Sequence, residues 1–239
     1  MGAAKTPSPF RRPQNLRTLT EEQRAEERTS TWLELFFDLC FVVAVAALAR
    51  GLHDDPTLDG TLRFVGLFVP VWWSWMTFTW YATGFDNDDV PYRVTLLAAM
   101  LFMLGIAASV EGVGSDAGAT AGFVVSYSAL RLLLVWLFLR ARSNVPSGIR
   151  RFVSLYAAGN GLGAVLWLAS LLLPGSARYA ARAVALSVEL LAPILAVRAL
   201  ENPRVSYHPR HIAERYGLFT IIVLGESVLA VASGTAGTE

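Results

Sequence analysis

Seven long apolar stretches constrain this chain more than any other feature of its sequence. Short segments rich in Gly, Pro and charged residues separate them, and they lie at roughly residues 33–50, 62–82, 94–111, 121–139, 152–173, 181–199 and 217–234. A helix needs about 20 mostly apolar residues to cross the hydrocarbon core of a bilayer. Helices satisfy their own backbone hydrogen bonds in lipid, and no series of short alternating segments indicates a barrel. We therefore predict an all-α polytopic transmembrane helix bundle of about seven spans.

The composition agrees with a membrane protein. Hydrophobic residues make up 54% of the chain and charged residues 16%, with a mean hydropathy of +0.45. Soluble chains carry about 25% charged residues. The net charge of +1 leaves no basic surface for nucleic acid, which we do not expect as a partner. Cys40 is the only cysteine, so an intrachain disulfide and a thiolate metal cluster are both excluded.

The distribution of basic residues predicts the orientation in the membrane. Residues 1–31 mix Lys and Arg with Glu and contain no apolar core of a signal peptide, so we expect a charged, disordered arm before a transmembrane bundle at 32–239. Fifteen of the 20 Lys and Arg residues lie in this arm or in the second, fourth and sixth loops. Cytoplasmic loops are enriched in Lys and Arg. The N-terminus is therefore predicted to be cytoplasmic.

Among the charged residues inside the predicted spans, we single out five: Glu34, Asp38, Arg131, Glu189 and Glu226. A charged residue at the centre of a membrane helix costs about 2.5–3.5 kcal/mol on insertion scales. Each of these side chains should therefore have an oppositely charged partner or face a hydrated cavity. Because the set contains four acids and one base, a hydrated interior would favour cations.

Three of these residues are predicted to lie at a similar depth in the membrane. At about 1.5 Å per residue, Glu226 lies about 15 Å from the cytoplasmic end of its span. Arg131 and Glu189 lie about 15 Å and about 12 Å from the outer ends of theirs. All three should lie near the bilayer midplane. We predict Arg131 and Glu189 as a structural pair and place Glu226 in a polar interior.

Three further polar residues are assigned to that interior. Glu34 and Asp38 are four residues apart, so they share one face of the first helix near its cytoplasmic end. Asn160 lies within "GNGLG" (159–163), whose glycines permit close contact between helices. These polar residues fit either an ion or proton path or a structural clamp in which Arg131 locks the fourth span to the sixth or seventh. Both interpretations remain open.

The cytoplasmic loop "FDNDDVPYR" (85–93) carries Asp86, Asp88 and Asp89. Three carboxylates could hold Mg²⁺ or Ca²⁺, but the loop lacks the central glycine and the downstream bidentate Glu of a calcium loop. Helix capping and pairing with the basic arm are the favoured roles, so no metal site is predicted.

Neither catalytic residues nor a cofactor site is indicated by the sequence. It contains no Ser/His/Asp order, no phosphate-binding loop and no dinucleotide-binding glycine motif. Trp72, Trp73 and Trp75 lie too deep for an interfacial belt, and we expect them to pack inside the bundle rather than to form a cage for an organic cation. We predict no catalytic residues, no cofactor and no enzymatic activity.

Three stretches together resemble the bacterial low temperature requirement A (LtrA) family: "WLELFFDLCFVVAVAALA" (32–49), "VWWSWMTFTWYATGFDNDDVPYR" (71–93) and "HPRHIAERYGLFTIIVLGESVLA" (208–230). The resemblance implies a multi-pass protein of the bacterial cytoplasmic (inner) membrane. The family's motif positions carry over to Glu34, Asp38, Asp86, Asp88, Asp89, Glu214, Arg215, Gly225 and Glu226. Family members usually continue with further spans, so residues 32–239 should be the N-terminal part of a longer family domain.

The expected function is transport or conduction of a small cation or proton, with Asp38 and Glu226 on the path. A non-transporting scaffold or sensor linked to growth in the cold is one alternative, and an intramembrane enzyme acting on lipid is another. The expected partners are the lipid bilayer and a small cation or proton, and a homo-oligomer is left open.

Overall fold

The computed structural model describes residues 13–15, 32–86, 89–198 and 209–236. Their long helices are α2 (Trp32–Asp54), α3 (Leu58–Gly84), α4 (Val90–Ser109), α5 (Ala117–Arg142), α6 (Ser147–Ala169), α7 (Ala177–Arg198) and α8 (Pro209–Ala236). Two 3₁₀ turns, η2 (Val110–Gly112) and η3 (Ser170–Leu172), extend α4 and α6. Each of the seven apolar stretches overlaps one of these helices over most of its length, so the all-helical prediction is confirmed.

Five of the described helices are long and apolar enough to cross a membrane. They cover Trp32–Asp54, Val90–Gly112, Ala117–Arg142, Ser147–Leu172 and Ala177–Arg198. With 27 and 28 residues, α3 and α8 also have sufficient length, but they are not among the five. The number of spans and the cytoplasmic N-terminus therefore stay predictions.

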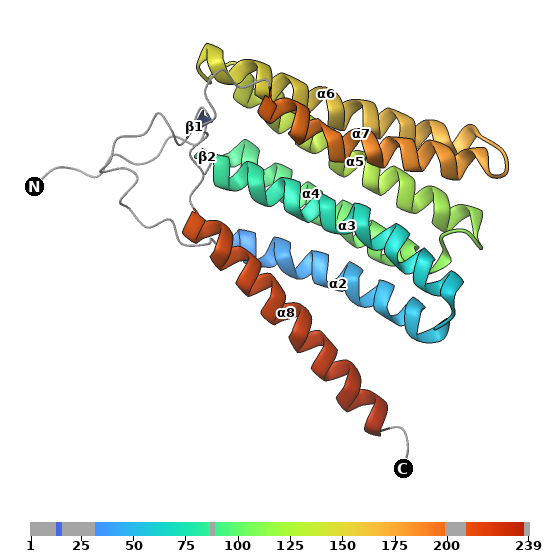
Figure 1. Cartoon of the computed structure of the whole chain (residues 1–239). Helices are drawn as coiled ribbons and strands as arrows, with labels where there is room; N and C mark the ends of the chain where they lie inside the picture. The colour runs from blue at the N-terminus through green and yellow to red at the C-terminus, as the bar shows by residue number, and fades with distance from the viewer. Residues whose placement is uncertain (1–12, 16–31, 87–88, 199–208, 237–239) are drawn as a thin grey trace, which may run out of the picture.

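The helices from α2 to α7 lie side by side along one direction, whereas α8 crosses the bundle obliquely and diverges from it toward its C-terminal end (Figure 1). α5 packs against α3, α4 and α6, and α7 packs against α6. α2 packs against α3 and α4. α8 packs against α2 and α3. α3 therefore lies between the α5 side of the bundle and α8.

Polar caps define the turns between helices. Asp89 precedes α4 and accepts a hydrogen bond from the backbone N–H of Tyr92 at 3.1 Å, which satisfies one of the unpaired donors of the first turn. Thr57 caps α3 in the same way, because its hydroxyl oxygen accepts a hydrogen bond from the backbone N–H of Gly60 at 3.2 Å. The predicted capping role of the 85–93 loop is confirmed for Asp89.

A short antiparallel pair of strands joins the N-terminal arm to the α3–α4 loop. β1 (Gln14–Asn15) pairs with β2 (Phe85–Asp86), with Gln14 opposite Asp86. Two residues are too few for the alternating pattern that predicts a strand, so the sequence analysis missed this pairing. Most of the arm, at 1–12 and 16–31, lies outside the described residues.

Large aromatic residues are buried in the interior, and many large aliphatic residues are exposed on the outside. Trp75, Tyr81 and Tyr127 are fully buried, whereas Leu101 and Val165 are 69% and 59% exposed. Many such exposed apolar side chains along the helices agree with a surface that faces lipid, where they need no polar cover. The buried position of Trp75 agrees with the predicted packing role.

Candidate functional site

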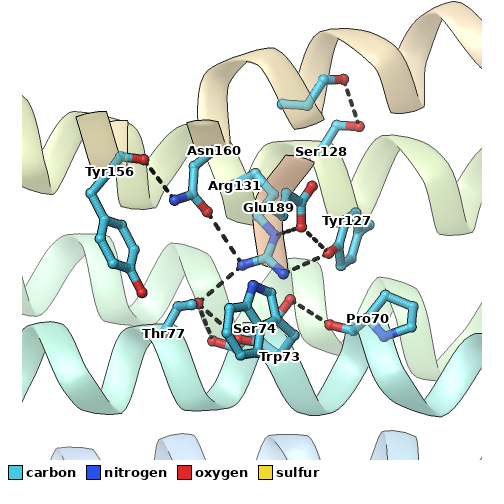
Figure 2. Close-up of polar contacts among 11 residues, drawn as sticks. Pro70, Trp73, Ser74, Thr77, Tyr127, Ser128, Arg131, Tyr156, Asn160 and Glu189 are labelled. Atoms are coloured by element: carbon cyan, nitrogen blue, oxygen red, sulfur yellow. Dashed lines mark hydrogen bonds and ion pairs between the residues drawn. The ribbon is translucent and has the colours of Figure 1, made fainter. Parts of the chain in front are cut away.

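Two clusters of buried charge lie on opposite sides of α3. The first, called here the Arg131 cluster, consists of Thr77, Tyr127, Arg131, Asn160 and Glu189. Arg131 and Glu189 are both fully buried, and Arg131 Nε lies 2.8 Å from Glu189 Oε2 (Figure 2). This ion pair ties α5 to α7. The structure thus joins the two residues that the sequence analysis singled out as a pair.

Tyr127 bridges the Arg131 guanidinium and the Glu189 carboxylate in addition to their direct ion pair. Its hydroxyl donates to Glu189 Oε2 and accepts from Arg131 Nη2, both at 2.5 Å. Tyr127 lies one helical turn before Arg131 on α5, so the two side chains share one face. The sequence analysis missed Tyr127, although this four-residue spacing was a signal that could have identified it.

Two further helices supply neutral acceptors to the same guanidinium. Arg131 Nη1 donates to Thr77 Oγ1 of α3 at 3.0 Å and to Asn160 Oδ1 of α6 at 3.5 Å. Asn160 is oriented by its own donation to the Tyr156 carbonyl at 2.8 Å. Arg131 therefore contacts α3, α6 and α7 in addition to its own helix (Figure 2). Asn160 belongs to this cluster.

Glycines on α6 make room for Glu189. A Cβ atom at Gly163 would lie 2.4 Å from Glu189 Oε1, and one at Gly159 would lie 2.3 Å from Ala192 Cβ. Neither distance is sterically allowed, so only glycine permits α6 and α7 to approach this closely. The predicted close contact at "GNGLG" is confirmed, and the structure adds that Gly163 opens the space for the carboxylate.

The second cluster, called the Asp38 cluster, consists of Glu34, Asp38, Trp75 and Arg215. Asp38 Oδ1 accepts from Trp75 Nε1 at 2.8 Å and from Arg215 Nη2 at 2.5 Å. Asp38 is fully buried and Arg215 is 1% exposed. The second carboxylate oxygen, Oδ2, is also buried and has no hydrogen-bond partner among the described residues.

The Asp38 cluster holds α8 against the bundle. The ring of Trp75 stacks on Phe219 at a centroid distance of 4.3 Å and meets Tyr216 edge-on at 4.9 Å. Arg215 comes from the same part of α8 as these two rings. Glu34 lies one turn before Asp38 on α2 and is also buried.

Arg215 changes the predicted balance of charge. The sequence analysis counted it as a cytoplasmic loop cation, but it lies in the second turn of α8 and is buried against Asp38. The ratio of four acids to one base inside the spans is therefore wrong. The described interior contains Glu34, Asp38 and Glu189 beside Arg131 and Arg215, which nearly balances the charge.

Glu226 does not lie in this interior, contrary to the prediction. Its side chain is exposed in the second half of α8, next to Gly225, which is also exposed. Glu214, nearer the start of α8, is exposed as well. The depth of a residue along its helix gives its distance from the membrane surface but not its lateral neighbours. Glu226 can therefore share a level with Arg131 without lying near it.

Asp89 pairs with a different partner from the one predicted. It is buried, and its carboxylate accepts from Arg140 Nη1 at 3.1 Å and also contacts Arg140 Nη2. Arg140 belongs to the end of α5, not to the arm. Asp86 contributes its backbone to β2, while Asp88 and the side chain of Asp86 lie outside the described residues. Within the described parts of the chain, no group of three or more His, Cys, Asp or Glu could hold a metal ion.

The apolar helices and the two buried charge clusters together define a membrane protein with a helix-bundle core. The sequence profile of the bacterial low temperature requirement A protein (LtrA) matches residues 29–239. The chain therefore belongs to the LtrA family, which confirms the resemblance carried by the three sequence motifs.

One curated relative has a comparable sequence. Over 220 residues the chain is 29% identical to the uncharacterized protein RA0937 of Rhizobium meliloti (strain 1021), covering 90% of this chain and 53% of the relative. The chain thus spans about half the length of the curated relative it matches. No solved structure matches the chain.

Proposed function

We propose that the protein moves a small cation or a proton across the bacterial cytoplasmic membrane, and that the Asp38 cluster is the element that handles the ion. The observation that carries this proposal is the buried Asp38 Oδ2, which has no hydrogen-bond partner among the described residues. A carboxylate oxygen buried in this way is costly unless a proton, a cation or water occupies it during function.

The contacts of Asp38 suit a site that opens and closes. Arg215 neutralises Asp38 in the described conformation, and Arg215 belongs to α8, which packs only along part of its length. A proton or cation at Asp38 would compete with the guanidinium of Arg215. Binding of the ion would then release α8, and loss of the ion would return it.

The Arg131 cluster fits a different role. Its guanidinium contacts Glu189, Tyr127, Thr77 and Asn160 and so ties α5 to α3, α6 and α7, while Glu189 Oε1 is buried without a hydrogen-bond partner among the described residues. We assign it as the holding element that keeps α3, α5, α6 and α7 together while α8 moves. We propose no catalytic role for either cluster.

Ion flux into proteoliposomes tests the proposal. The purified parent protein should give flux of protons, K⁺ or Na⁺ above that of empty vesicles, and Asp38→Asn should reduce it at least about tenfold, the factor that corresponds to about 1.4 kcal/mol. Asp59→Asn is the matched control, because Asp59 is an exposed carboxylate in the first turn of α3. Its flux should equal that of the parent.

A variant in which Asp38 and Arg215 are both replaced by neutral residues distinguishes a role of Asp38 in ion handling from a role in supporting the fold. Replacing both partners of a buried ion pair is far less destabilising than removing one. The double variant Asp38→Asn/Arg215→Gln should therefore fold but remain inactive if Asp38 handles the ion. Recovery of flux in this variant, or a parent flux no greater than that of empty vesicles, would contradict the proposal and favour a scaffold or sensor.

A further inference from the structure

A cavity of about 480 Å³ opens at the end of the bundle where α3, α5 and α7 begin. α3 and α7 form its sides, while Phe123 of α5 and Trp167 of α6 also line it. Sites for small ligands have volumes of about 300–1,000 Å³. The cavity is therefore large enough for part of a lipid or another small molecule.

Two arginines give the cavity a positive charge. Arg182 Nε donates to Ser170 Oγ at 3.1 Å, and Arg63 Nη2 donates to the backbone carbonyl of Glu111 at 2.6 Å. These neutral acceptors position Arg63 and Arg182 without cancelling their charge. The Glu111 carboxylate is bound by Arg50 at 3.1 Å. Within the described residues, neither Arg63 nor Arg182 forms an ion pair with a carboxylate.

The remaining walls of the cavity are mostly apolar. Leu62, Leu67 and Leu186 line it together with the two aromatic side chains, and Leu62 is 61% exposed on the outer surface of α3. A small hydrophilic anion would satisfy the arginines but leave these walls empty. An uncharged lipid would fill the walls but leave the arginines without partners.

We propose that this cavity binds the anionic headgroup and the upper acyl chain of a phospholipid from the surrounding membrane. Arg63 and Arg182 bind the phosphate, for which guanidinium groups have a suitable donor geometry. The acyl chain lies along the apolar walls between α3 and α7. Basic pockets between membrane helices bind anionic lipid headgroups on the cytoplasmic side of other proteins, and the predicted orientation would put this pocket in the outer leaflet instead.

The bound lipid would contact the neighbours of the Arg131 cluster. The rings of Phe123 and Trp167 lie 6.2 and 4.8 Å from the ring of Tyr127, whose hydroxyl bonds both Arg131 and Glu189. Lipid binding therefore supports the packing around the ion pair. This site is independent of the transport proposal, because none of its residues belongs to the Asp38 cluster.

Native mass spectrometry of the purified full chain in detergent tests the site. With dioleoyl phosphatidylglycerol as the probe, we expect the parent to retain lipid about tenfold more strongly than with dioleoyl phosphatidylcholine, the factor expected from charge-assisted contacts. The double variant Arg63→Gln/Arg182→Gln should lose this preference. Arg142→Gln/Arg151→Gln removes two exposed arginines at the other end of the bundle and should keep it.

A cavity-filling variant tests the position of the acyl chain with both arginines intact. Gly66 lines the cavity, and a Cβ atom placed there meets nothing within 4 Å, so Gly66→Phe should fold and block the cavity. Gly217 of α8 has the same open surroundings and is not part of the cavity lining, so Gly217→Phe is the matched control. We expect loss of phosphatidylglycerol only in Gly66→Phe.

Three results would overturn the proposal. The first is equal retention of phosphatidylglycerol and phosphatidylcholine by the parent. The second is unchanged retention in Gly66→Phe. The third is displacement of the lipid by inorganic phosphate at equal concentration, which would show a site for free anions that does not use the acyl chain.

Discussion

At the scale of single residues, Arg131 and Asp38 show how one buried charge organises several neighbours. Arg131 contacts a carboxylate, a phenol, a hydroxyl and an amide. Asp38 contacts a guanidinium and an indole and keeps one oxygen unpaired among the described residues. Glu189 Oε1 in the Arg131 cluster is likewise buried without a hydrogen-bond partner among the described residues. The two clusters differ in what they join: Arg131 links four packed helices, whereas Asp38 links α2 and α3 to α8, and this difference is the basis for assigning them different roles.

The buried ion pair should matter far more for stability than an exposed one. Glu189→Gln leaves the buried Arg131 without its counter-charge, so we expect a loss of about 3–5 kcal/mol in the free energy of unfolding. Glu111→Gln breaks the ion pair with Arg50, whose side chains are 63% and 55% exposed, and should cost less than about 1 kcal/mol. Denaturant titration in mixed micelles measures both values, and similar losses would contradict the assigned role of Glu189.

At the scale of helices, α3 is the element shared by the two clusters. Trp75 donates to Asp38 on one side of α3, and Thr77 accepts from Arg131 on the other. Residues two positions apart on a helix project in nearly opposite directions, so α3 separates the clusters and contacts both. Among the described helices, α3 therefore contributes a side chain to both clusters.

The α6–α7 contact depends on a glycine, and a neighbouring glycine gives the control. Gly163→Ala places a Cβ atom 2.4 Å from Glu189 Oε1, so the carboxylate must shift and weaken its bond to Arg131, at an expected cost of about 1–3 kcal/mol in the free energy of unfolding. Gly161→Ala meets only Val135 Cγ2 at 3.7 Å, an ordinary contact. Its effect should stay within about 1 kcal/mol. Equal unfolding midpoints for the two variants would show that the close approach is not required.

At the scale of the whole molecule, the described loops alternate between the two ends of the bundle (Figure 1). The loop between α5 and α6 lies at the end of the bundle near β1 and β2, and the turn between α4 and α5 lies at the opposite end. Arginines concentrate at the first of these ends. This arrangement is the one that an orientation with cytoplasmic basic loops requires.

Cysteine labelling tests that orientation. In a Cys40→Ala background, Ser115→Cys should react with a membrane-impermeant maleimide on intact cells, because the α4–α5 turn is predicted to be outside. Ser143→Cys, in the α5–α6 loop, should react only after the membrane is permeabilised. Both serines are exposed and one helix separates them. The reverse pattern would contradict the cytoplasmic N-terminus, and labelling of both on intact cells would contradict α5 as a span.

The lengths and positions of the helices followed from the sequence because hydropathy is a local property. The same reasoning showed that Arg131 and Asp38 need partners, since burying a charge is costly in any fold. The predicted depth of each residue in the membrane paired Glu189 with Arg131. The same depth also placed Glu226 in the interior, whereas the structure shows its side chain exposed. Depth alone cannot distinguish a neighbour from a residue at the same level elsewhere.

The identity of the partners was decided by the tertiary structure. Arg215 bonds Asp38 across 177 residues of sequence, and Thr77 reaches Arg131 across 54. Such contacts depend on the rotation of each helix about its axis and on the order in which the helices pack. The hydropathy of a single helix predicts neither its rotation nor its packing order, because lipid-facing and core-facing positions in a membrane bundle are both apolar. The sequence by itself determined that this is a helical membrane protein with buried charges, and only packing decided which charges meet.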